Sequence, residues 1–238
     1  MNVIISGANG GIGKALVQHY VDDGHQVYCL THGDVAALPS GIADALSSDW
    51  VHNPEDVVHW LESLDRQGAK PELVISCTGF LHSPAKGPEK QLAEAGWEFL
   101  MRNMELNCFA HVALSQCLDH LFGRKDSFIF AALSAMVGSI SDNQLGGWYS
   151  YRMSKAALNM FIKTLSVEWK RRYPNATAVA VHPGTTDSPL SAPFQSRIPD
   201  GKLYSPELTA RRLARVFNQL RPEQSGDLLF WDGSRLDY

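Results

Sequence analysis

Tyr151 and Lys155 are the two residues of this sequence whose types and spacing most clearly suggest acid–base chemistry. They lie four residues apart in a segment with helical periodicity, so both side chains project from one face of a helix. A free phenol titrates near pH 10, and making it useful at neutral pH requires about 4 kcal/mol of phenolate stabilisation. An ammonium group about 4 Å away, at an effective dielectric constant near 20, supplies roughly that amount. The pair predicts a proton-transferring tyrosine, although the same spacing also arises by chance on helix surfaces.

A glycine-rich turn follows the first apolar segment of the chain. Residues 6–13 read SGANGGIG, with Gly7, Gly11 and Gly13 in a GxxxGxG spacing. Glycine permits a tight turn from strand to helix and leaves backbone N–H groups free to face an anion. At the first strand–helix junction this spacing indicates a dinucleotide site. A plain tight turn is the alternative.

The residues after the second predicted strand bear on which nicotinamide cofactor is bound. An acidic side chain at this place binds the ribose 2′-hydroxyl and repels a 2′-phosphate. Here Thr31 and His32 occupy it, and the first acid is Asp34. This favours NADP over NAD, with Thr31 and His32 near the phosphate, but no Arg or Lys is present for the strongest contact. The alternative is that His32 is an ordinary solvated loop residue.

Short apolar segments alternate with longer amphipathic ones along the chain, which is typical of βαβ units. The strands lack polar alternation, as expected when helices cover both faces of a parallel sheet. Ligands of such sheets bind beyond the carboxyl ends of the strands, where the strand order reverses. We expect one α/β domain over residues 1–238, a Rossmann-type doubly wound parallel sheet of about seven strands. Strands are expected at 3–5, 26–30, 45–50, 73–77, 128–133, 178–182 and 227–231, and helices at 14–21, 54–65, 94–121, 150–172 and 206–220.

The composition excludes several classes of protein. The 21 basic and 25 acidic side chains give a net charge of −4, which argues against binding to nucleic acid or to an anionic membrane. Apolar residues make up 45% and charged residues 19%, which argues against intrinsic disorder. We expect no bilayer-spanning segment, no signal peptide and no metal site. The four cysteines form no CxxC pair and are expected to be free thiols in a reducing, cytoplasmic environment.

These motifs occur together in an order and spacing that resemble the classical short-chain dehydrogenase/reductases over essentially the whole chain. The stretch from Gly138 to Arg152 is more specific and is similar to the C-factor-like and sniffer-like carbonyl reductase branch, as are 225–226 and 232–233. The residues that carry the resemblance are Gly7, Gly11, Gly13, Asp49, Ser76, Cys77, Thr78, Gly79, Asn107, Ser134, Tyr151, Lys155, His182, Pro183 and Gly184.

The resemblance implies roles for four residues in catalysis. Tyr151 would protonate a carbonyl oxygen as hydride arrives from the nicotinamide. Lys155 would lower the pKa of Tyr151 and bind the ribose hydroxyls of the cofactor. Ser134 would hydrogen-bond the substrate oxygen, and Asn107 would hold a water that relays protons to Lys155.

The resemblance also implies an extended cofactor site. Asp49 would contact adenine, Gly79 would line the cofactor, and residues 183–185 with Ser188 would pass beneath the nicotinamide. Together with the turn and the Thr31–His32 pair, the expected cofactor-binding residues are Gly7, Asn9, Gly10, Gly11, Ile12, Gly13, Thr31, His32, Asp49, Trp50, Cys77, Thr78, Gly79, Tyr151, Lys155, Pro183, Gly184, Thr185 and Ser188.

Which serine binds the substrate oxygen is open. The family usually has its serine three residues before a glycine, and here that residue is Ala135, three before Gly138. Ser134 is one residue earlier and is favoured by position and chemistry. Ser139 and Ser141 are the alternatives.

A polar stretch with Pro and Gly at about 186–206 connects the sixth strand to the last helix and is expected to be a substrate lid. Phe80, Trp148, Tyr149 and Phe194 could wall an apolar pocket, or they could be ordinary core residues. The helical segments at 94–121 and 150–172 carry apolar residues on more than one face, which predicts a homodimer or homotetramer.

The sequence therefore predicts an NAD(P)-dependent oxidoreductase that prefers NADPH and acts on a small carbonyl or alcohol substrate. A cofactor-binding regulatory or signalling protein with little or no turnover is the alternative. Epimerase or dehydratase chemistry on the same scaffold is a third, weaker possibility.

Overall fold

A computed structural model describes all residues, 1–238, and contains one sheet with the strand order β3-β2-β1-β4-β5-β6-β7-β8. The first seven strands are parallel, and the two-residue β8 pairs antiparallel with β7. The sheet has one strand more than expected, because a strand as short as β8 does not show in the sequence pattern. The strands are β1 Asn2–Ser6, β2 Gln26–Thr31, β3 Asp44–Ser47, β4 Leu73–Ser76, β5 Ile129–Leu133, β6 Thr177–His182, β7 Leu228–Phe230 and β8 Arg235–Leu236.

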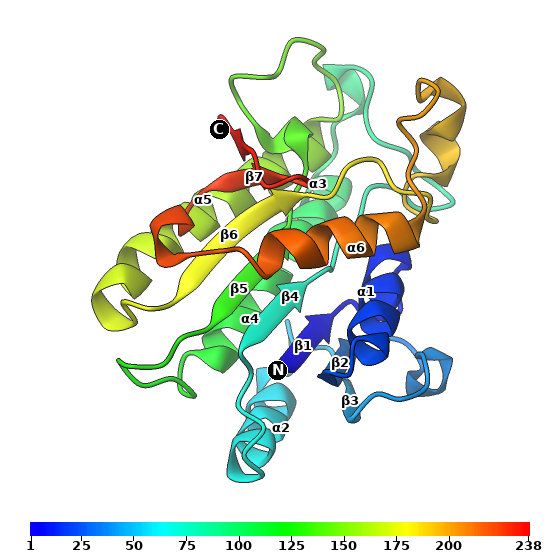
Figure 1. Ribbon diagram of the computed structural model, residues 1–238. Coiled ribbons are helices and arrows are strands. Elements are labelled where there is room, and N and C mark those ends of the chain that lie inside the picture. Colours follow the sequence, from blue (N-terminus) through cyan, green and yellow to red (C-terminus); the bar gives the residue numbers. More distant parts are fainter.

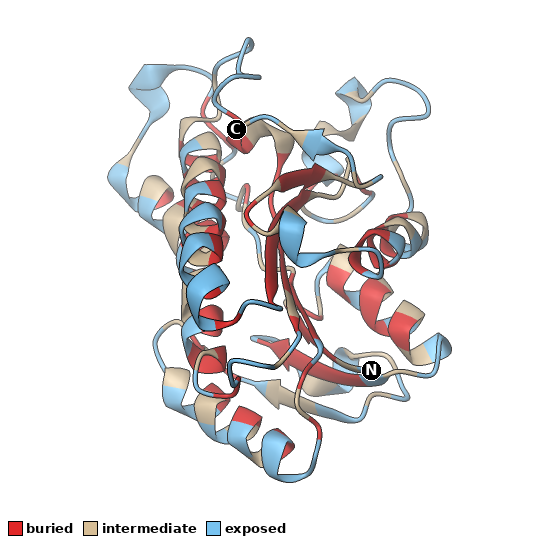
Figure 2. Cartoon of the chain, turned by 60° about the vertical axis from the view of Figure 1, so that its left-hand side comes forward, coloured by how far each residue is buried: buried red, intermediate tan, exposed pale blue.

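Helices cover both faces of the sheet (Figure 1). On one face α1 and α6 pack together, and on the other α2, α4 and α5 bury a second core. Figure 2 shows the buried strands between these two layers. The helices are α1 Gly11–Asp22, α2 Pro54–Arg66, α3 Trp97–Met104, α4 Ala110–Leu118, α5 Tyr149–Arg172 and α6 Pro206–Phe217. None of them is both long and apolar enough to cross a bilayer.

The segment expected to be helical at 94–121 is helical over most of its length, but it is divided into several parts. The segment begins with a short 3₁₀ turn at Leu92–Glu94, and α3 then runs into a π-helical turn at Glu105–Phe109 before α4 starts. Asn107 lies in this π turn and is fully buried. Such bulges occur where side chains are re-aimed at functional sites, and hydrophobic periodicity does not reveal them.

The strand order reverses between β1 and β4, which are neighbours although β2 and β3 intervene in the sequence. Ser6 and Ser76 lie side by side at the carboxyl ends of these strands, with their Oγ atoms 3.1 Å apart. The loops after β4, β5 and β6 gather at the same end of the sheet, in the upper right of Figure 1. This is the switch point at which a doubly wound sheet binds its ligands.

Candidate active site and cofactor crevice

The glycine-rich turn is built as a cradle that side chains would fill. Gly7 follows β1 with φ of +67°, and its carbonyl accepts a bond of 2.9 Å from the Gly10 N–H. A Cβ on Gly13 would lie 2.3 Å from the Gly7 oxygen, so only glycine lets α1 start this close to β1. No side chain caps the start of α1, and the N–H groups of its first turn are left for an anion.

The crevice beside this turn has a volume of about 1260 Å³ and extends to the segment after β6. A Cβ on Gly11 would lie 2.8 Å from Cβ of Ser188, which places Ser188 over the turn. Lys14 and Arg211 also line the crevice, and neither was singled out from the sequence. Lys14 directly follows Gly13, which could have drawn attention to it. The backbone N–H groups of the cradle, with Lys14 and Arg211, fit a dinucleotide pyrophosphate. The crevice is also lined by acidic side chains, those of Asp22, Asp23, Asp187 and Glu207.

A second group of predicted cofactor residues meets at the ends of β2 and β3. His32 Nε2 lies 3.8 Å from Asp49 Oδ1, and the His32 ring lies 4.7 Å from that of Trp50. His52, which sequence reasoning missed, holds the other oxygen of Asp49 at 2.9 Å. Burial raises the pKa of Asp49, but the bonds and charge of His52, with His32, outweigh it and bring this pKa below its usual value.

Three other predicted cofactor residues lie near this end of the strands, and each makes a different contact. The Thr31 hydroxyl accepts from the Gly33 N–H at 3.0 Å, and Asn9 Nδ2 donates to the Asp34 carbonyl at 3.0 Å. The indole of Trp50 is buried in the core and donates to the Ala110 carbonyl at 2.9 Å. The Trp50 ring therefore packs in the core, and the part of Trp50 in cofactor binding stays a prediction.

The end of β4 is pressed against the glycine-rich turn. A Cβ on Gly7 would lie 2.9 Å from the Thr78 nitrogen and 3.0 Å from the Cys77 carbonyl carbon. The Thr78 carbonyl accepts from Nε2 of the fully buried His111 at 3.1 Å. Burial and the charge of Lys155 lower the pKa of His111 to about 3, so this ring is neutral. Burial raises the pKa of the Cys77 thiol, which makes it unreactive at neutral pH.

Tyr151 and Lys155 lie together on α5, with only 8% and 3% of their surfaces exposed. Lys155 Nζ is 5.9 Å from the centre of the Tyr151 ring and donates to the Leu133 carbonyl at 2.8 Å. Gly79 approaches the same ammonium, since a Cβ there would lie 3.9 Å from Nζ. The predicted pair is thus assembled at the carboxyl edge of the sheet, at the ends of β4 and β5.

The expected lowering of the Tyr151 pKa by Lys155 is not found in this structure. Burial raises the pKa of Tyr151 above its ordinary value, and burial lowers the pKa of Lys155 to about 7 despite opposing contributions from Cys108 and Cys77. The cause is desolvation of both groups, because the single close partner of the ammonium is a backbone carbonyl. A raised pKa keeps Tyr151 protonated at neutral pH.

The side chain of Asn107 ties the loop after β4 to α5. Its Oδ1 accepts from the Phe80 N–H at 2.7 Å, and Nδ2 donates to the Phe80 carbonyl at 2.8 Å and to Ser154 Oγ at 3.0 Å. Asn103 Oδ1 is a third acceptor at 3.1 Å. The amide hydrogens are therefore used for positioning the loop, and the side chain has none left to donate to a relay water.

The three candidate serines are engaged away from Tyr151. Ser134 Oγ donates to Asn159 Oδ1 at 2.6 Å, while the next residue, Ala135, packs against Tyr151. Ser139 Oγ accepts from the Asp142 N–H at 3.2 Å and lies 3.3 Å from Ser141 Oγ. The Ser134 hydroxyl thus donates its hydrogen to Asn159, and it is Ala135 that belongs to the apolar cluster containing Tyr151.

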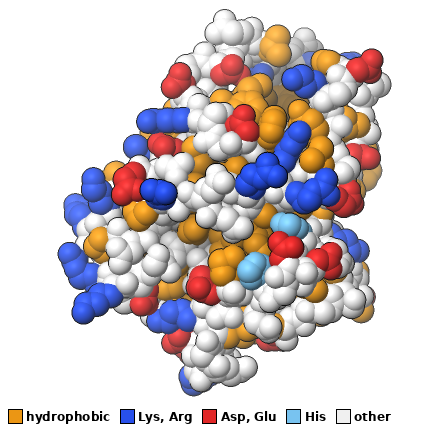
Figure 3. Space-filling view, viewed as in Figure 1, with side chains coloured by type: hydrophobic (Ala, Val, Ile, Leu, Met, Phe, Trp, Pro, Cys, Tyr) orange, Lys and Arg blue, Asp and Glu red, His pale blue; other side chains and the backbone are white.

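Apolar side chains enclose Tyr151. Trp148 lies 6.2 Å from the Tyr151 ring and 5.1 Å from that of Phe194, measured between ring centres. Phe80 instead pairs with Phe99, 5.7 Å away. Figure 3 shows hydrophobic side chains gathered above α6, toward the loops at the carboxyl edge, and Lys and Arg side chains along α6. The cluster around Tyr151 consists of Leu81, Ala135, Val137, Trp148, Leu190 and Phe194.

The segment at 186–206 folds over this cluster. It contains a 3₁₀ turn at Ala192–Arg197, and its two ends are joined by a parallel bridge between Thr186 and Tyr204. The Pro189 carbonyl accepts from His82 Nε2 at 3.1 Å, which links the segment to the loop after β4. At its beginning Gly184 has φ of +78°, and a Cβ there would press on the rings of Tyr204 and Trp231 at 3.0 and 3.1 Å.

Comparisons with known proteins agree with this architecture. The family described as short chain dehydrogenase matches residues 1–198. A 1-hydroxy-2-glutathionyl-2-methyl-3-butene dehydrogenase of Rhodococcus sp. is 27% identical over 239 residues, 99% of each chain. The C-signal protein of Myxococcus xanthus is 33% identical over 108 residues, 45% of this chain and 60% of the relative.

Solved structures share the fold over the full length. Carbonyl reductase Sniffer of D. melanogaster superimposes with a TM-score of 0.83 at 19% identity and covers 100% of both chains. The NADPH-bound carbonyl reductase from chicken fatty liver gives 0.80 at 21% identity, over 99% of this chain and 93% of the other. These matches agree with the resemblance to the C-factor-like and sniffer-like branch, in fold for Sniffer and over part of the chain for C-signal. The chain belongs to the short-chain dehydrogenase family and is, as its sequence predicted, an NAD(P)-dependent oxidoreductase.

Proposed function

We propose that the protein reduces a small neutral ketone or aldehyde to an alcohol, with Tyr151 as the proton donor and NADPH as the preferred hydride source. The observation that carries the proposal is the burial of Tyr151 and Lys155 together at the switch point of the sheet. The NADPH-bound carbonyl reductase with the same fold supports the choice of cofactor. In the reverse direction the same site oxidises the alcohol.

The roles of the residues follow from their protonation. A bound nicotinamide cofactor supplies the hydride to the carbonyl carbon. Tyr151 donates its phenolic proton to the carbonyl oxygen, which completes the alcohol and leaves a phenolate. The phenol carries its proton at neutral pH, and because burial raises its pKa further above 10, the charge of Lys155 must offset that burial before the proton is given up. The ammonium form of Lys155 stabilises the phenolate that results and binds the ribose hydroxyls.

The cofactor is held by the chain from three directions. The open N–H groups at the start of α1, with Lys14 and Arg211, bind the pyrophosphate. His32, whose Nε2 lies 3.8 Å from Asp49 Oδ1 at the ends of β2 and β3, would contribute the contact to a 2′-phosphate. Ser188 covers the turn from the opposite side.

The segment at 186–206 acts as a substrate lid that carries Leu190 and Phe194 onto the cluster around Tyr151. The pocket it closes offers apolar walls and one proton donor, which suits a neutral carbonyl compound. The buried free cysteines fit a reducing compartment, and the cytoplasm is the proposed location.

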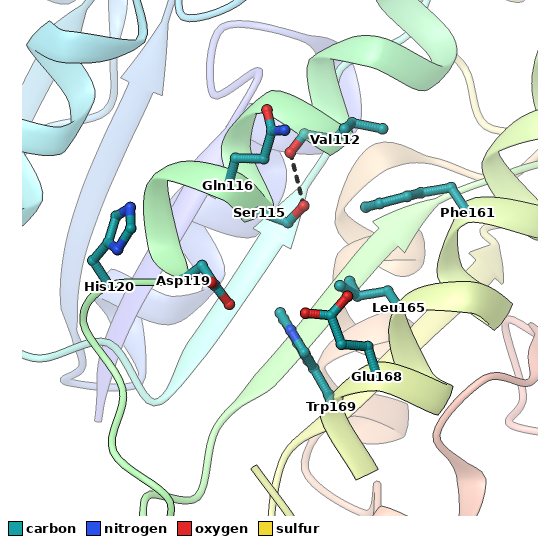
Figure 4. A pocket seen from close by; sticks show the side chains of 9 residues that line it. All are labelled: Val112, Ser115, Gln116, Asp119, His120, Phe161, Leu165, Glu168 and Trp169. Carbon is teal, nitrogen blue, oxygen red and sulfur yellow. Dashed lines mark hydrogen bonds between the residues drawn. The ribbon is translucent and has the colours of Figure 1, made fainter. Parts of the chain in front are cut away.

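We also propose a homodimer or homotetramer formed through α4 and α5. Met153, Met160 and Val167 recur every seven residues on α5 and are exposed. Between the two helices lies a groove of about 430 Å³ (Figure 4), with Phe161 and Leu165 on one side and Val112 on the other. An exposed apolar stripe beside a groove is typical of a surface that a second copy covers.

Replacement of Tyr151 by Phe tests the proposed function most directly. Tyr151→Phe removes the proton and keeps the ring, so kcat for reduction is expected to fall at least about 100-fold. The affinity for NADPH, measured by fluorescence titration, is expected to stay within about twofold. The assay follows NADPH absorbance with a panel of neutral carbonyl compounds that includes benzil. Undiminished turnover in the variant rejects the role of Tyr151, and tight NADPH binding with no turnover by the natural protein favours the regulatory alternative.

Replacement of His32 tests cofactor selection. His32→Ala is expected to weaken NADPH binding by about tenfold, because a charged contact to the 2′-phosphate is lost, and to leave NADH binding unchanged. His52→Ala is the matched control, since His52 flanks Asp49 from the other side. Titrations with NADPH and with NADH measure the ratio of the two affinities for each variant. An equal loss for NADPH and NADH would show that His32 does not read the phosphate.

Sedimentation equilibrium tests the assembly. The natural protein is expected to show at least twice the 26.3 kDa of one chain. Met160→Glu places a charge on the proposed interface and is expected to shift the mass toward one chain, while Gln18→Glu on α1, at the opposite face of the sheet, is expected to leave it unchanged. A natural protein with the mass of a single chain would contradict the proposal.

A further inference from the structure

Glu89 is a buried carboxylate that the proposed chemistry does not use. It lies on the loop after β4, and only 1% of its surface is exposed. It forms no ion pair within 4.0 Å of a basic side chain. Burying a carboxylate without a cationic partner is costly, so its remaining contacts must compensate.

Those contacts all go to the beginning of α5. The carboxylate accepts from the Ser150 N–H at 3.2 Å and from the Ser150 hydroxyl, which is itself 1% exposed. The main-chain carbonyl of Glu89 accepts from the Trp148 N–H at 2.5 Å. Trp148 is the cap position of α5, and its own side chain caps nothing. Glu89 therefore provides, from a different loop, the hydrogen-bond acceptor that a Ser or Asp at the cap position of a helix normally provides. The charge of the Glu89 carboxylate lies at the positive end of the α5 dipole.

The backbone that enters α5 is unusual. Gly146, Gly147 and Trp148 have φ of +63°, +65° and +53°, and Trp148 is the one non-glycine residue with positive φ in the chain. A bulky side chain occupies this region only where its surroundings enforce it. The Glu89 carbonyl also lies against Gly147, 3.3 Å from where a Cβ would be. Glu89 is thus placed to enforce the left-handed conformation.

This conformation directs the Trp148 ring onto the ring of Tyr151, at 6.2 Å and nearly at right angles. Tyr151 follows Ser150 in the first turn of α5. The packing of the phenol and its position along the helix therefore both depend on how α5 begins. From this geometry we infer that Glu89 is a positioning residue that fixes Tyr151 for proton transfer by capping α5 from the loop after β4. The inference rests on the proposed role of Tyr151.

Glu89→Ala and Glu89→Gln separate positioning from general stability. Misplacing a reacting group by about 1 Å costs up to about 100-fold in rate, so Glu89→Ala is expected to lower kcat at least about tenfold. Glu89→Gln keeps an oxygen for the Ser150 N–H and is expected to restore kcat to within about threefold of the natural protein. NADPH affinity is expected to stay within about twofold in both, because the glycine-rich turn is separate.

Glu72→Ala is the matched control. The Glu72 carboxylate also accepts a backbone bond, from the Asn2 N–H at 2.9 Å, but it is exposed and lies just before β4, at the opposite end of this strand from the loop that carries Glu89. Its kcat is expected to equal that of the natural protein. Should Glu89→Ala not fold, Ser150→Ala, which removes one of the two bonds to the carboxylate, is expected to lower kcat with unchanged NADPH affinity.

Three results would overturn the inference. They are an unchanged kcat in both Glu89→Ala and Ser150→Ala, a Glu89→Gln variant as slow as Glu89→Ala, and a parallel loss of kcat and NADPH affinity. The kinetic probe is benzil or another carbonyl compound that the natural protein reduces. Absence of any turnover by the natural protein would count against the proposed function itself, which distinguishes the two failures.

Discussion

The removal of Tyr151 and Lys155 from water is the constraint on which the rest of the site depends. A charged amine loses several kcal/mol of hydration in such a place unless partners replace the water. Here the ammonium has one acceptor, the Leu133 carbonyl, and its pKa falls to about 7. The chain alone therefore holds a neutral phenol beside an amine that is easily charged or discharged, and the charged amine is the group that would stabilise the phenolate once the proton is given up.

The surrounding structure can be understood as support for this pair. The parallel strands bring Gly79 and Leu133 to one edge, where both contact the lysine. The π turn aims Asn107 at the loop after β4 and at α5 simultaneously. Glu89 fixes the first turn of α5, and the segment at 186–206 covers Tyr151 with Leu190 and Phe194. Each of these contacts joins the loops to α5, so the helix is held at its functional end.

The sequence predicts those parts of the site that depend on local patterns. The glycine-rich turn was predictable because close approach of backbone permits no side chain at Gly7 or Gly13. The pairing of Tyr151 with Lys155 was predictable from the helical spacing, and the parallel sheet from the apolar strands. His32 and Asp49 were each singled out after a predicted strand, and the structure places their side chains 3.8 Å apart.

Features that depend on tertiary contacts were not predictable. The direction of the Tyr151 pKa depends on how completely the phenol is buried and on the carbonyl that takes the ammonium, and neither is visible in a motif. Ser134 was favoured by position, but its hydroxyl binds Asn159 on α5, and Ala135 belongs to the cluster around Tyr151. Glu89 lies in a loop without periodicity, and only the fold shows that it caps a helix 60 residues further along the chain.

The burial of the pair is tested most directly by an NMR titration of the Lys155 side chain in the protein without cofactor, assigned by comparison with Lys155→Met. We expect an apparent pKa of about 7 for Lys155. A value near the 10.5 of an ordinary lysine would contradict the proposed burial of the pair. The ammonium would then be solvated or paired with a negative charge, and the phenol beside it would not lie in a site that excludes water.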